Sequence, residues 1–528
     1  MNFALTEREL AEPYLRRWLG TLGLDVDYVR AEGNTVYLRN EDGTETPVLD
    51  YVGGYGALIL GHNHPQLVAH AKELLDAQTP VLVQFSRHPV ANQVAIALNT
   101  IIQREQGTDE PYSVIFANSG AEAIETAIKH AELDRVLRCA ALRDEIAANV
   151  EQARTALRRG EAVISDDAYL MTAIGRCDTE VDGFEKLVAD LNRVNAQGLA
   201  RPPMFLALEG SFHGKLVGSI QLTHNTTYRT PFAAMAAQTR FVALNQPEAL
   251  ARIVEQERST LFDIELVDGV VRLVTRTAPI FTAFLVEPIQ GEGGIIVLSE
   301  QFAREVRQVC DAIGCPIVVD EVQSGMGRSG SFLASSRIGL RGDYYALAKS
   351  LGGGLTKVSV LLVRQTRYRP EFEFVHSSTF AKDGFSCAIA LKMLELLEAD
   401  DGLVYRLADE RGGALTSALR SVAAEFPDVV KDVRGMGLML GLEFQDQSAS
   451  ASQPITESAK AGLFGYMIAG FLLREHRIRI FPTASAGNTL RFEPSVYLSD
   501  EQINRMVTAL RDVCAVLRAQ DGHRLVTS

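Results

Sequence analysis

The chain has 528 residues, 47% of them hydrophobic, so it is long enough for two or more domains around a large buried core. Its 66 acidic and 52 basic residues give a net charge of −14, which argues against a general binder of nucleic acid or of an anionic membrane surface. Six cysteines form no Cys-x-x-Cys pair, which argues against a disulfide framework and a zinc site. Without a leader-like start or an apolar run that could span a bilayer, we expect a soluble, cytoplasmic protein.

The N-terminal part of the chain combines a predicted helix with two short strands. Residues 7–22 predict the helix, and residues 26–31 and 35–39 predict the strands. Beyond them, His62 and His64 stand in a Gly-His-Asn-His-Pro sequence. Because no third ligand accompanies this pair, we predict no metal site.

A predicted strand at residues 114–117 leads directly into a helix start. Ser119 is a good N-cap, and Gly120 and Ala121 would be the first helical residues. The free amides and partial positive charge of a helix start favour a phosphate group. By itself the pattern is weak, because most such starts are only capped helices.

The centre of the chain places polar residues directly after apolar runs. Glu287, Asp320 and Lys349 each follow such a run, and residues 300–313, between the first two runs, have apolar side chains at helical spacing. Alternating strands and helices predict a parallel sheet, and ligands bind beyond the carboxyl ends of its strands. A lysine and an aspartate there indicate pyridoxal phosphate, because the lysine forms a Schiff base with the aldehyde and the aspartate keeps the ring nitrogen protonated.

Residues 286–294, 319–325 and 347–354 resemble the class III aminotransferases, pyridoxal-phosphate enzymes of fold type I. The three motifs occur in the family's order and spacing. The resemblance implies an α/β fold, with a mostly parallel seven-stranded sheet flanked by helices in a large domain and a smaller α+β domain. The implied parts are residues 1–60, which join the small domain, residues 61–375 for the large domain, residues 376–400 for a connecting helix and residues 401–528 for the small domain.

The resemblance also implies which residues hold the cofactor. They are Ser119, Gly120, Ala121, Phe212, His213, Glu287, Asp320, Val322, Gln323, Lys349 and Thr379. Phe212 and Val322 would enclose the pyridine ring, and Gln323 would donate a hydrogen bond to the ring oxygen. Thr379 would reach the phosphate bound by the other subunit, which implies a homodimer with active sites at the interface.

Four further residues are implied to contact the substrate, namely Tyr55, Lys215, Glu292 and Arg491. Arg491 would bind the α-carboxylate of an amino-acid donor, and Glu292 would pair with Arg491 when no carboxylate is present. Tyr55 would line the pocket, with buried packing as the alternative. Lys215 stands where many glutamate-using members have an arginine, and this position is similar to that in diamine and aldehyde aminotransferases.

Two segments depart from the family pattern. Residues 138–203 form an insert with helical segments near residues 140–159 and 184–195, and residues 261–275 predict a hairpin around Asp268-Gly269. The insert would be a packed surface elaboration, a cover of the active-site entrance, an extended subunit interface or a docking site. Together the two segments resemble natural-product pathway aminotransferases of the prodigiosin and caerulomycin type, which aminate aldehydes.

We therefore expect an aminotransferase that moves an amino group from an amino-acid donor to an aldehyde or ketone, in a biosynthetic pathway. The alternatives are a diamine or ω-amino-acid aminotransferase, an aminomutase or decarboxylase with the same cofactor, and a cofactor-free interaction protein, against which Lys349 and Asp320 count. Residues 325–330 spell Gly-x-Gly-x-x-Gly. Residues 320–323 separate them from the preceding strand and no clear helix follows, which disfavours a nicotinamide dehydrogenase.

Overall fold

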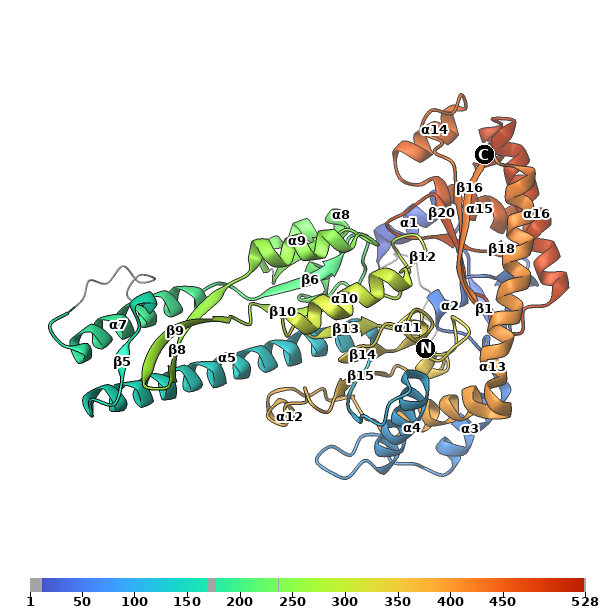
Figure 1. Cartoon of the computed structure of the whole chain (residues 1–528). Coiled ribbons are helices and arrows are strands. Elements are labelled where there is room, and N and C mark those ends of the chain that lie inside the picture. The colour runs from blue at the N-terminus through green and yellow to red at the C-terminus, as the bar shows by residue number, and fades with distance from the viewer. Residues whose placement is uncertain (1–11, 169–176, 236, 527–528) are drawn as a thin grey trace.

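The computed structural model describes residues 12–168, 177–235 and 237–526, and Figure 1 shows its arrangement. Its centre is a seven-stranded sheet in which every neighbouring pair is parallel except those that involve β15. This confirms the predicted mostly parallel sheet. In spatial order the strands are β4 (Tyr112–Ala117), β15 (Ser359–Arg364), β14 (Tyr344–Leu347), β13 (Ile317–Asp320), β10 (Phe281–Val286), β6 (Met204–Leu208) and β7 (Gln238–Val242).

Successive side chains of these strands point to opposite faces, and each face is covered by helices. On one face Ala283 and Leu285 of β10 belong to a buried cluster with α5. On the other face Phe284 and Val286 belong to the largest core cluster. The helices concerned are α4 (Pro89–Gln106), α5 (Gly120–Arg158), α10 (Glu300–Ala312) and α13 (Gly384–Glu425). Because both faces are buried, the central strands are mostly apolar, as the sequence indicated.

A second core lies in the C-terminal part of the chain, around a four-stranded sheet. Its elements are β16 (Val430–Met436), β17 (Met439–Phe444), β20 (Thr489–Phe492), β19 (Phe481–Pro482), α14 (Gln453–Lys460), α15 (Phe464–His476) and α16 (Asp500–Arg518). Helix α13 enters this part after a break at residues 399–402, where the backbone leaves helical geometry. Within residues 376–400, where a connecting helix was expected, the helix begins at Gly384 and is the part of α13 before the break.

The N-terminal segment packs against this second part through a mixed sheet. It contains α1 (Pro13–Thr21), β1 (Tyr28–Glu32), β2 (Thr35–Arg39) and β3 (Glu45–Asp50), and β3 pairs in parallel with β18 (Ile478–Arg479). Both predicted strands are present. Of the predicted helix at residues 7–22, residues 7–11 lie outside the described residues.

The short elements lie mainly in the connections, and several of them border the carboxyl edge of the large sheet. They are α2 (Gly53–Gly56), α3 (Pro65–Asp76), η1 (Ser219–Leu222), α8 (Thr226–Arg229), η2 (Thr230–Met235), α9 (Pro247–Glu257), β11 (Ile289–Gln290), β12 (Ile296–Val297), α11 (Ala334–Arg337), η3 (Lys349–Gly352), α12 (Phe372–Val375) and η4 (Gly522–Arg524). No helix among the described residues is long and apolar enough to cross a membrane.

Both departures from the family pattern fold together into one projection, here called the arm (Figure 1). It consists of residues 138–168 and 177–200 and the hairpin, with β5 (Val163–Ile164), α7 (Glu180–Leu199), β8 (Thr260–Val267) and β9 (Val270–Thr277). The hairpin is confirmed, and its turn residues Asp268 and Gly269 have φ of 52° and 75°. The predicted segment at residues 140–159 is no separate helix, because α5 continues from Gly120 to Arg158.

The arm has a hydrophobic core of its own and a firm attachment to the large domain. Phe184 of α7 and Leu261 of β8 are buried in that core. At the base of the arm the buried carboxylate of Asp134 contacts Arg138 Nε at 2.9 Å and Arg369 Nε at 2.7 Å. A charge removed from water needs such partners, so Asp134 fixes α5 to the loop after β15.

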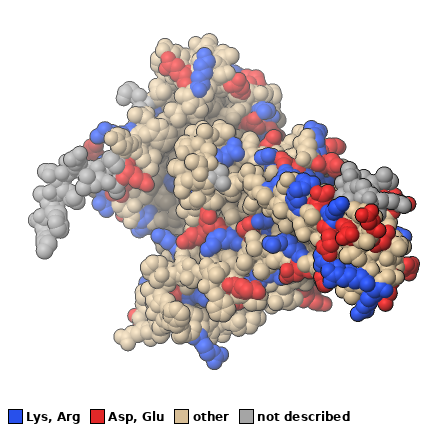
Figure 2. Space-filling view, turned by 90° about the vertical axis from the view of Figure 1, so that its left-hand side faces the viewer, with Lys and Arg blue, Asp and Glu red and all other residues tan. Residues whose placement is uncertain are grey.

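The arm's surface carries charges of both signs. Figure 2, which views the molecule from the arm's side, shows basic and acidic side chains interspersed on this face. Arg154, for example, lies 2.8 Å from Glu185. A nucleic-acid-binding face would instead gather positive charge.

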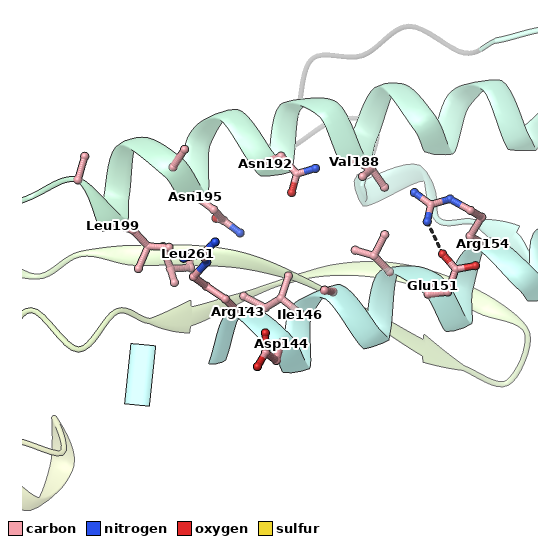
Figure 3. A pocket seen from close by; sticks show the side chains of 14 residues that line it. Arg143, Asp144, Ile146, Glu151, Arg154, Val188, Asn192, Asn195, Leu199 and Leu261 are labelled. Atoms are coloured by element: carbon pink, nitrogen blue, oxygen red, sulfur yellow. Dashed lines mark hydrogen bonds and ion pairs between the residues drawn. The ribbon is translucent and has the colours of Figure 1, made fainter. Parts of the chain in front are cut away.

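A groove of ≈770 Å³ separates α5 from α7 on the arm (Figure 3). Its floor includes the apolar residues Ile146, Val188 and Leu261. Among its charged residues, Arg154 and Glu151 are paired with each other at 2.5 Å. The groove lies away from the strand ends that carry Asp320 and Lys349, where the residues capable of acid–base or nucleophilic chemistry converge.

Candidate active site

Three neighbouring parallel strands bring the central polar residues to one edge of the sheet. In register, β10 pairs Val286 with Val319 of β13, and β13 pairs Asp320 with Ala346 of β14. Glu287, Asp320 and Lys349 therefore meet at the carboxyl edge and line one pocket of ≈210 Å³. The other lining residues are Gly120, Ala121, Ile124, Phe212, His213, Gly214, Ile289, Glu292, Val322, Gln323 and Ser324.

Asp320 is held in place by two hydrogen bonds. Its Oδ2 lies 2.8 Å from Nδ1 of His213, and its Oδ1 accepts from the Val322 amide at 3.1 Å. His213 is buried, and although burial alone would lower the pKa of His213, the hydrogen bond and charge of Asp320 raise it above its usual value. The pair thus places the Asp320 carboxylate at the floor of the pocket with the imidazole of His213 hydrogen-bonded behind it.

Glu287 supports the wall of the pocket through the backbone. Its carboxylate accepts from the amides of Phe212 at 2.9 Å and Gly291 at 3.3 Å. Burial, with a smaller contribution from Asp320 and against the opposing charge of His213, raises the pKa of Glu287 to about 7. Glu287 therefore fixes the segment that presents Phe212 to the pocket.

The amino end of α5 borders the pocket opposite these acids. Ser119 and Glu122 form a capping box, in which the Ser119 hydroxyl accepts from the Glu122 amide at 3.3 Å. The Ser119 side chain is thus engaged with its own helix, whereas Gly120 and Ala121 line the pocket. A Cβ on Gly120 would lie 2.6 Å from Val322 Cγ1, so only glycine lets the helix start come this close.

Lys349 follows β14 in a strained conformation, with φ at 47°. Enclosure in the pocket lowers the pKa of the Lys349 amine, and Arg491 acts in the same direction, against the raising effect of Glu493 and other carboxylates. A lowered pKa makes the neutral amine available, and only the neutral amine is a nucleophile or a base.

Arg491 is buried beside the pocket and is paired with Glu292, which lines it. Arg491 NH1 lies 2.5 Å from Glu292 Oε1, and Glu292 Oε2 accepts from the Ala484 amide at 2.7 Å. Although burial alone would raise it, Arg491 holds the pKa of Glu292 below its usual value. The Tyr55 ring lies 4.7 Å from the guanidinium carbon and is 45% exposed, which contradicts the alternative of a buried packing tyrosine.

Glu493 is part of this cluster and was not predicted. Its Oε1 accepts from Gln323 Nε2 at 2.7 Å, and its Oε2 lies 3.5 Å from Arg491 Nε. Gln323 lines the pocket, and its amide is held by Glu493. The sequence feature that could have indicated Glu493 is its position as an acidic residue directly after the strand that carries Arg491.

Lys215 and Thr379 do not line this pocket. Lys215 is exposed, with its ammonium 4.0 Å from the centre of the Tyr228 ring. Thr379 is also exposed, and its backbone oxygen accepts from Gln84 at 2.9 Å. In this single chain, therefore, neither side chain contributes to the pocket around Lys349.

The two other motifs in the sequence are structural here. His62 Nε2 lies 2.9 Å from Asp50 and His64 stacks on Tyr497, and the described residues contain no group of three or more potential metal ligands. In the glycine motif, the buried guanidinium of Arg328 donates to the carbonyl oxygens of Gly56 and Pro494. The motif therefore joins backbone segments.

A family model described as aminotransferase class-III matches residues 20–514. The chain belongs to the class III aminotransferases. As in that family, its cofactor is pyridoxal phosphate, and it is a transaminase. The fit of the site is direct: the free amides at Gly120 and Ala121 suit a phosphate, Phe212 and Val322 border the space for a ring, and Asp320 and Lys349 face the same pocket.

Solved structures of similar fold extend over nearly the whole chain. An amine transaminase from an uncultivated Pseudomonas species, in its PLP-bound form, is 22% identical, with a TM-score of 0.66, and covers 98% of this chain and 99% of that one. A thermostable engineered omega transaminase is 19% identical, with a TM-score of 0.67 and 98% coverage of each chain. Ornithine aminotransferase from Toxoplasma gondii is 20% identical, with a TM-score of 0.64, and covers 94% of this chain and 91% of that one. At these identities the likeness shows the fold.

Proposed function

We propose that this transaminase takes its amino group from an amino-acid donor and passes it to an aldehyde or ketone in a biosynthetic pathway. The observation that carries the donor assignment is the buried Arg491 guanidinium paired with Glu292 at 2.5 Å. An arginine can bind a carboxylate through two parallel hydrogen bonds, and Glu292 occupies one of these donors, NH1. A donor carboxylate would replace Glu292 on Arg491.

Different residues of the pocket have different roles in the reaction. When bound, pyridoxal phosphate supplies the aldehyde that receives the amino group and a ring that accepts electrons. Asp320, supported by His213, holds a proton on the ring nitrogen, and the amides of Gly120 and Ala121 bind the phosphate. Lys349 Nζ takes a proton from the donor carbon and returns one to the acceptor carbon.

A diamine or ω-amino-acid donor is the second candidate, and one observation favours it. Lys215, at the position where many glutamate-using members have an arginine, is exposed and packs over Tyr228. Lysine lacks the planar fork that holds a distal carboxylate. Such a donor would use a 2-oxoacid as its acceptor.

We also propose that the enzyme works as a homodimer with its active sites at the interface. Segments 80–85 and 379–384 lie side by side, since the Gly384 amide donates to Val81 and Gln84 donates to Thr379. These segments and α12 expose large apolar side chains, namely Val81, Leu82, Val83, Phe85, Phe374, Val375 and Phe380. Contiguous exposed apolar surface is typical of a protein interface, and Thr379 lies within it.

The test of the donor is the visible absorbance of the purified protein with pyridoxal phosphate, recorded after separate additions of L-glutamate, L-alanine and a diamine. An amino-acid donor predicts that glutamate or alanine converts the absorbance to that of the aminated cofactor. Conversion by the diamine alone would favour the second candidate. A coloured protein that none of them converts would overturn both assignments and point to mutase or decarboxylase chemistry.

A second test separates carboxylate recognition from general damage. Arg491→Ala should raise KM for carboxylate-bearing donors by about 100-fold, because a bidentate charged contact contributes about 3 kcal/mol. The KM for 1-phenylethylamine, which has no carboxylate, should change much less. An equal loss for both kinds of donor would sink the role proposed for Arg491.

A further inference from the structure

Glu493 occupies a position behind the pocket where a carboxylate is costly. It follows β20 directly and is fully buried. Its backbone amide donates to Tyr51 at 2.8 Å, which fixes the chain at this point. A Cβ on Gly56 would lie 3.0 Å from Glu493 Oε1, so the backbone of Gly56 packs against the carboxylate. Burial of a charge is unfavourable unless partners compensate, and here Oε1 accepts a hydrogen bond whereas Oε2 has only the ion pair with Arg491 at 3.5 Å.

The first partner of Glu493 is the amide of Gln323. Since Gln323 Nε2 donates to Glu493 Oε1 at 2.7 Å, one hydrogen of the amide group is committed to Glu493. A Cβ on Gly291 would lie 2.2 Å from Gln323 Oε1, so the other end of the amide is enclosed by backbone. The carboxylate therefore fixes which atom of the amide points where, and a charged acceptor makes this hydrogen bond stronger than a neutral one.

The second partner is the guanidinium of Arg491, which two carboxylates share. Glu292 contacts NH1 at 2.5 Å, whereas Glu493 lies 3.5 Å from Nε. Glu292 borders the pocket, but Glu493 approaches from the rear, on the β20 segment itself. When a donor carboxylate replaces Glu292, the contact of Glu493 with Nε is left in place.

We propose that Glu493 is a positioning residue, which holds the Gln323 amide toward the cofactor site and the Arg491 guanidinium toward the donor site. The Gln323 half needs only the cofactor that the family uses. The Arg491 half rests on the proposed carboxylate-bearing donor. One buried carboxylate thus links the two binding sites.

The Gln323 half is tested by the affinity for pyridoxal phosphate in a double-mutant cycle. Glu493→Ala should raise the Kd for pyridoxal phosphate about tenfold, which corresponds to one charged hydrogen bond. In a Gln323→Ala background the same substitution should change the Kd by less than about twofold, because its partner is already absent. Equal effects in the two backgrounds would overturn this half.

The conservative substitution Glu493→Gln distinguishes the two halves. Its amide oxygen can still accept from Gln323 Nε2, so the Kd for pyridoxal phosphate should stay within about threefold of wild type. It cannot make an ion pair with Arg491 Nε, so KM for L-glutamate or L-alanine should rise about fivefold and KM for 1-phenylethylamine should not. Removing the negative charge of Glu493 strengthens the attraction of Arg491 equally for Glu292 and for the donor carboxylate, which compete for it. The expected rise in KM therefore reflects only the loss of positioning.

The controls decide between positioning and general damage. Glu425→Gln alters an ion-paired carboxylate at the end of α13, 2.9 Å from Arg511 Nε, and should change neither Kd nor KM. If Glu493→Ala does not fold, Glu493→Gln still tests the proposal through the KM ratio. A KM that changes equally for both kinds of donor would overturn the Arg491 half. If the amino-acid donor assignment is wrong, the wild-type enzyme itself will not react with amino acids. The double-mutant cycle on the Kd for pyridoxal phosphate does not depend on that assignment.

Discussion

At the scale of single residues, the chemistry depends on side chains that are poorly solvated and held by neighbours. Lys349 has a lowered pKa because it is enclosed, and Asp320 is fixed by His213 and by the Val322 amide. A lowered pKa favours the neutral amine of Lys349, which is the form that can accept a proton.

Replacement of Lys349 tests its role as the proton carrier. Lys349→Ala should lower the rate of amino transfer about a thousandfold or more, because a positioned acid–base group contributes that much. The rate should be measured by single turnover with the cofactor loaded at saturating concentration. Lys357→Ala, eight positions further along the chain and exposed, is the matched control and should keep the wild-type rate. Full activity of Lys349→Ala would refute the role.

Glu287 predicts a pH dependence of stability with a defined sign. Its folded-state pKa of about 7 exceeds its ordinary value of 4.5, so the folded protein binds this proton more tightly than the unfolded chain. The stabilisation is complete below pH 4.5 and is lost as the pH rises through 7. Between pH 5 and pH 8, apo-protein carrying Glu287→Gln should therefore lose less thermal stability than wild type, as measured by calorimetry.

The comparison needs a control carboxylate that lies outside the pocket. Glu161→Gln alters an exposed residue of the arm and should follow the wild-type profile. Parallel profiles for Glu287→Gln and wild type would show that Glu287 does not take up the proton.

Residues that follow strands were predictable from the sequence, but their partners were not. Glu287, Asp320 and Lys349 were predicted to share a sheet edge, and they line one pocket. The contact of Glu493 with Gln323 joins positions 170 residues apart, so no local pattern could indicate it. Likewise, only the coordinates show that the Ser119 hydroxyl caps its helix.

At the scale of elements, the arm shows what periodicity can and cannot reveal. The hairpin was predictable, because Asp-Gly stands between alternating strands and supports their turn. The insert and the hairpin, however, share one core, and this depends on contacts between segments about 100 residues apart in the sequence. Continuous helix through Arg138 was also not evident, because a local pattern does not show where tertiary packing lets a helix continue.

Because the arm has a separate core, we predict that it can be destabilised without loss of cofactor binding. Phe184→Ala should cost about 3 kcal/mol, because it leaves a cavity in the core of the arm. Limited proteolysis should then cut the arm much faster than in wild type, while the Kd for pyridoxal phosphate stays within about twofold. Phe284→Ala, in β10 of the central sheet, is the matched control and should impair cofactor binding as well. Loss of the cofactor from Phe184→Ala would show that the arm supports the pocket.

At the scale of the whole molecule, the proposed dimer accounts for an apolar surface that a monomer would leave in water. Phe85 and Phe374 are almost fully exposed in the single chain. Thr379 lies with them and away from its own chain's pocket. A partner subunit that covers these side chains would also receive Thr379.

A charge within that surface tests the dimer. Phe374→Glu should raise the dimer dissociation constant at least about tenfold, since an unpaired charge would be buried in the interface. Sedimentation velocity over a dilution series measures the constant, and activity should fall in parallel with the dimer fraction. Val163→Glu, at an exposed site on the arm, should leave both unchanged. A Phe374→Glu enzyme that is fully active as a monomer would contradict the proposal.

Helix α5 has a mechanical consequence, because a single rod joins the cofactor pocket to the arm. It begins at Gly120 beside the pocket and ends at Arg158, and its 39 residues give a length of about 58 Å. Asp134 clamps the rod to the large domain between its two ends. Because Ala123, Ile124 and Ala127 pack the first part of this helix against the sheet, a force on the arm would pass along α5 to Asp134 and from there into the core beside the pocket.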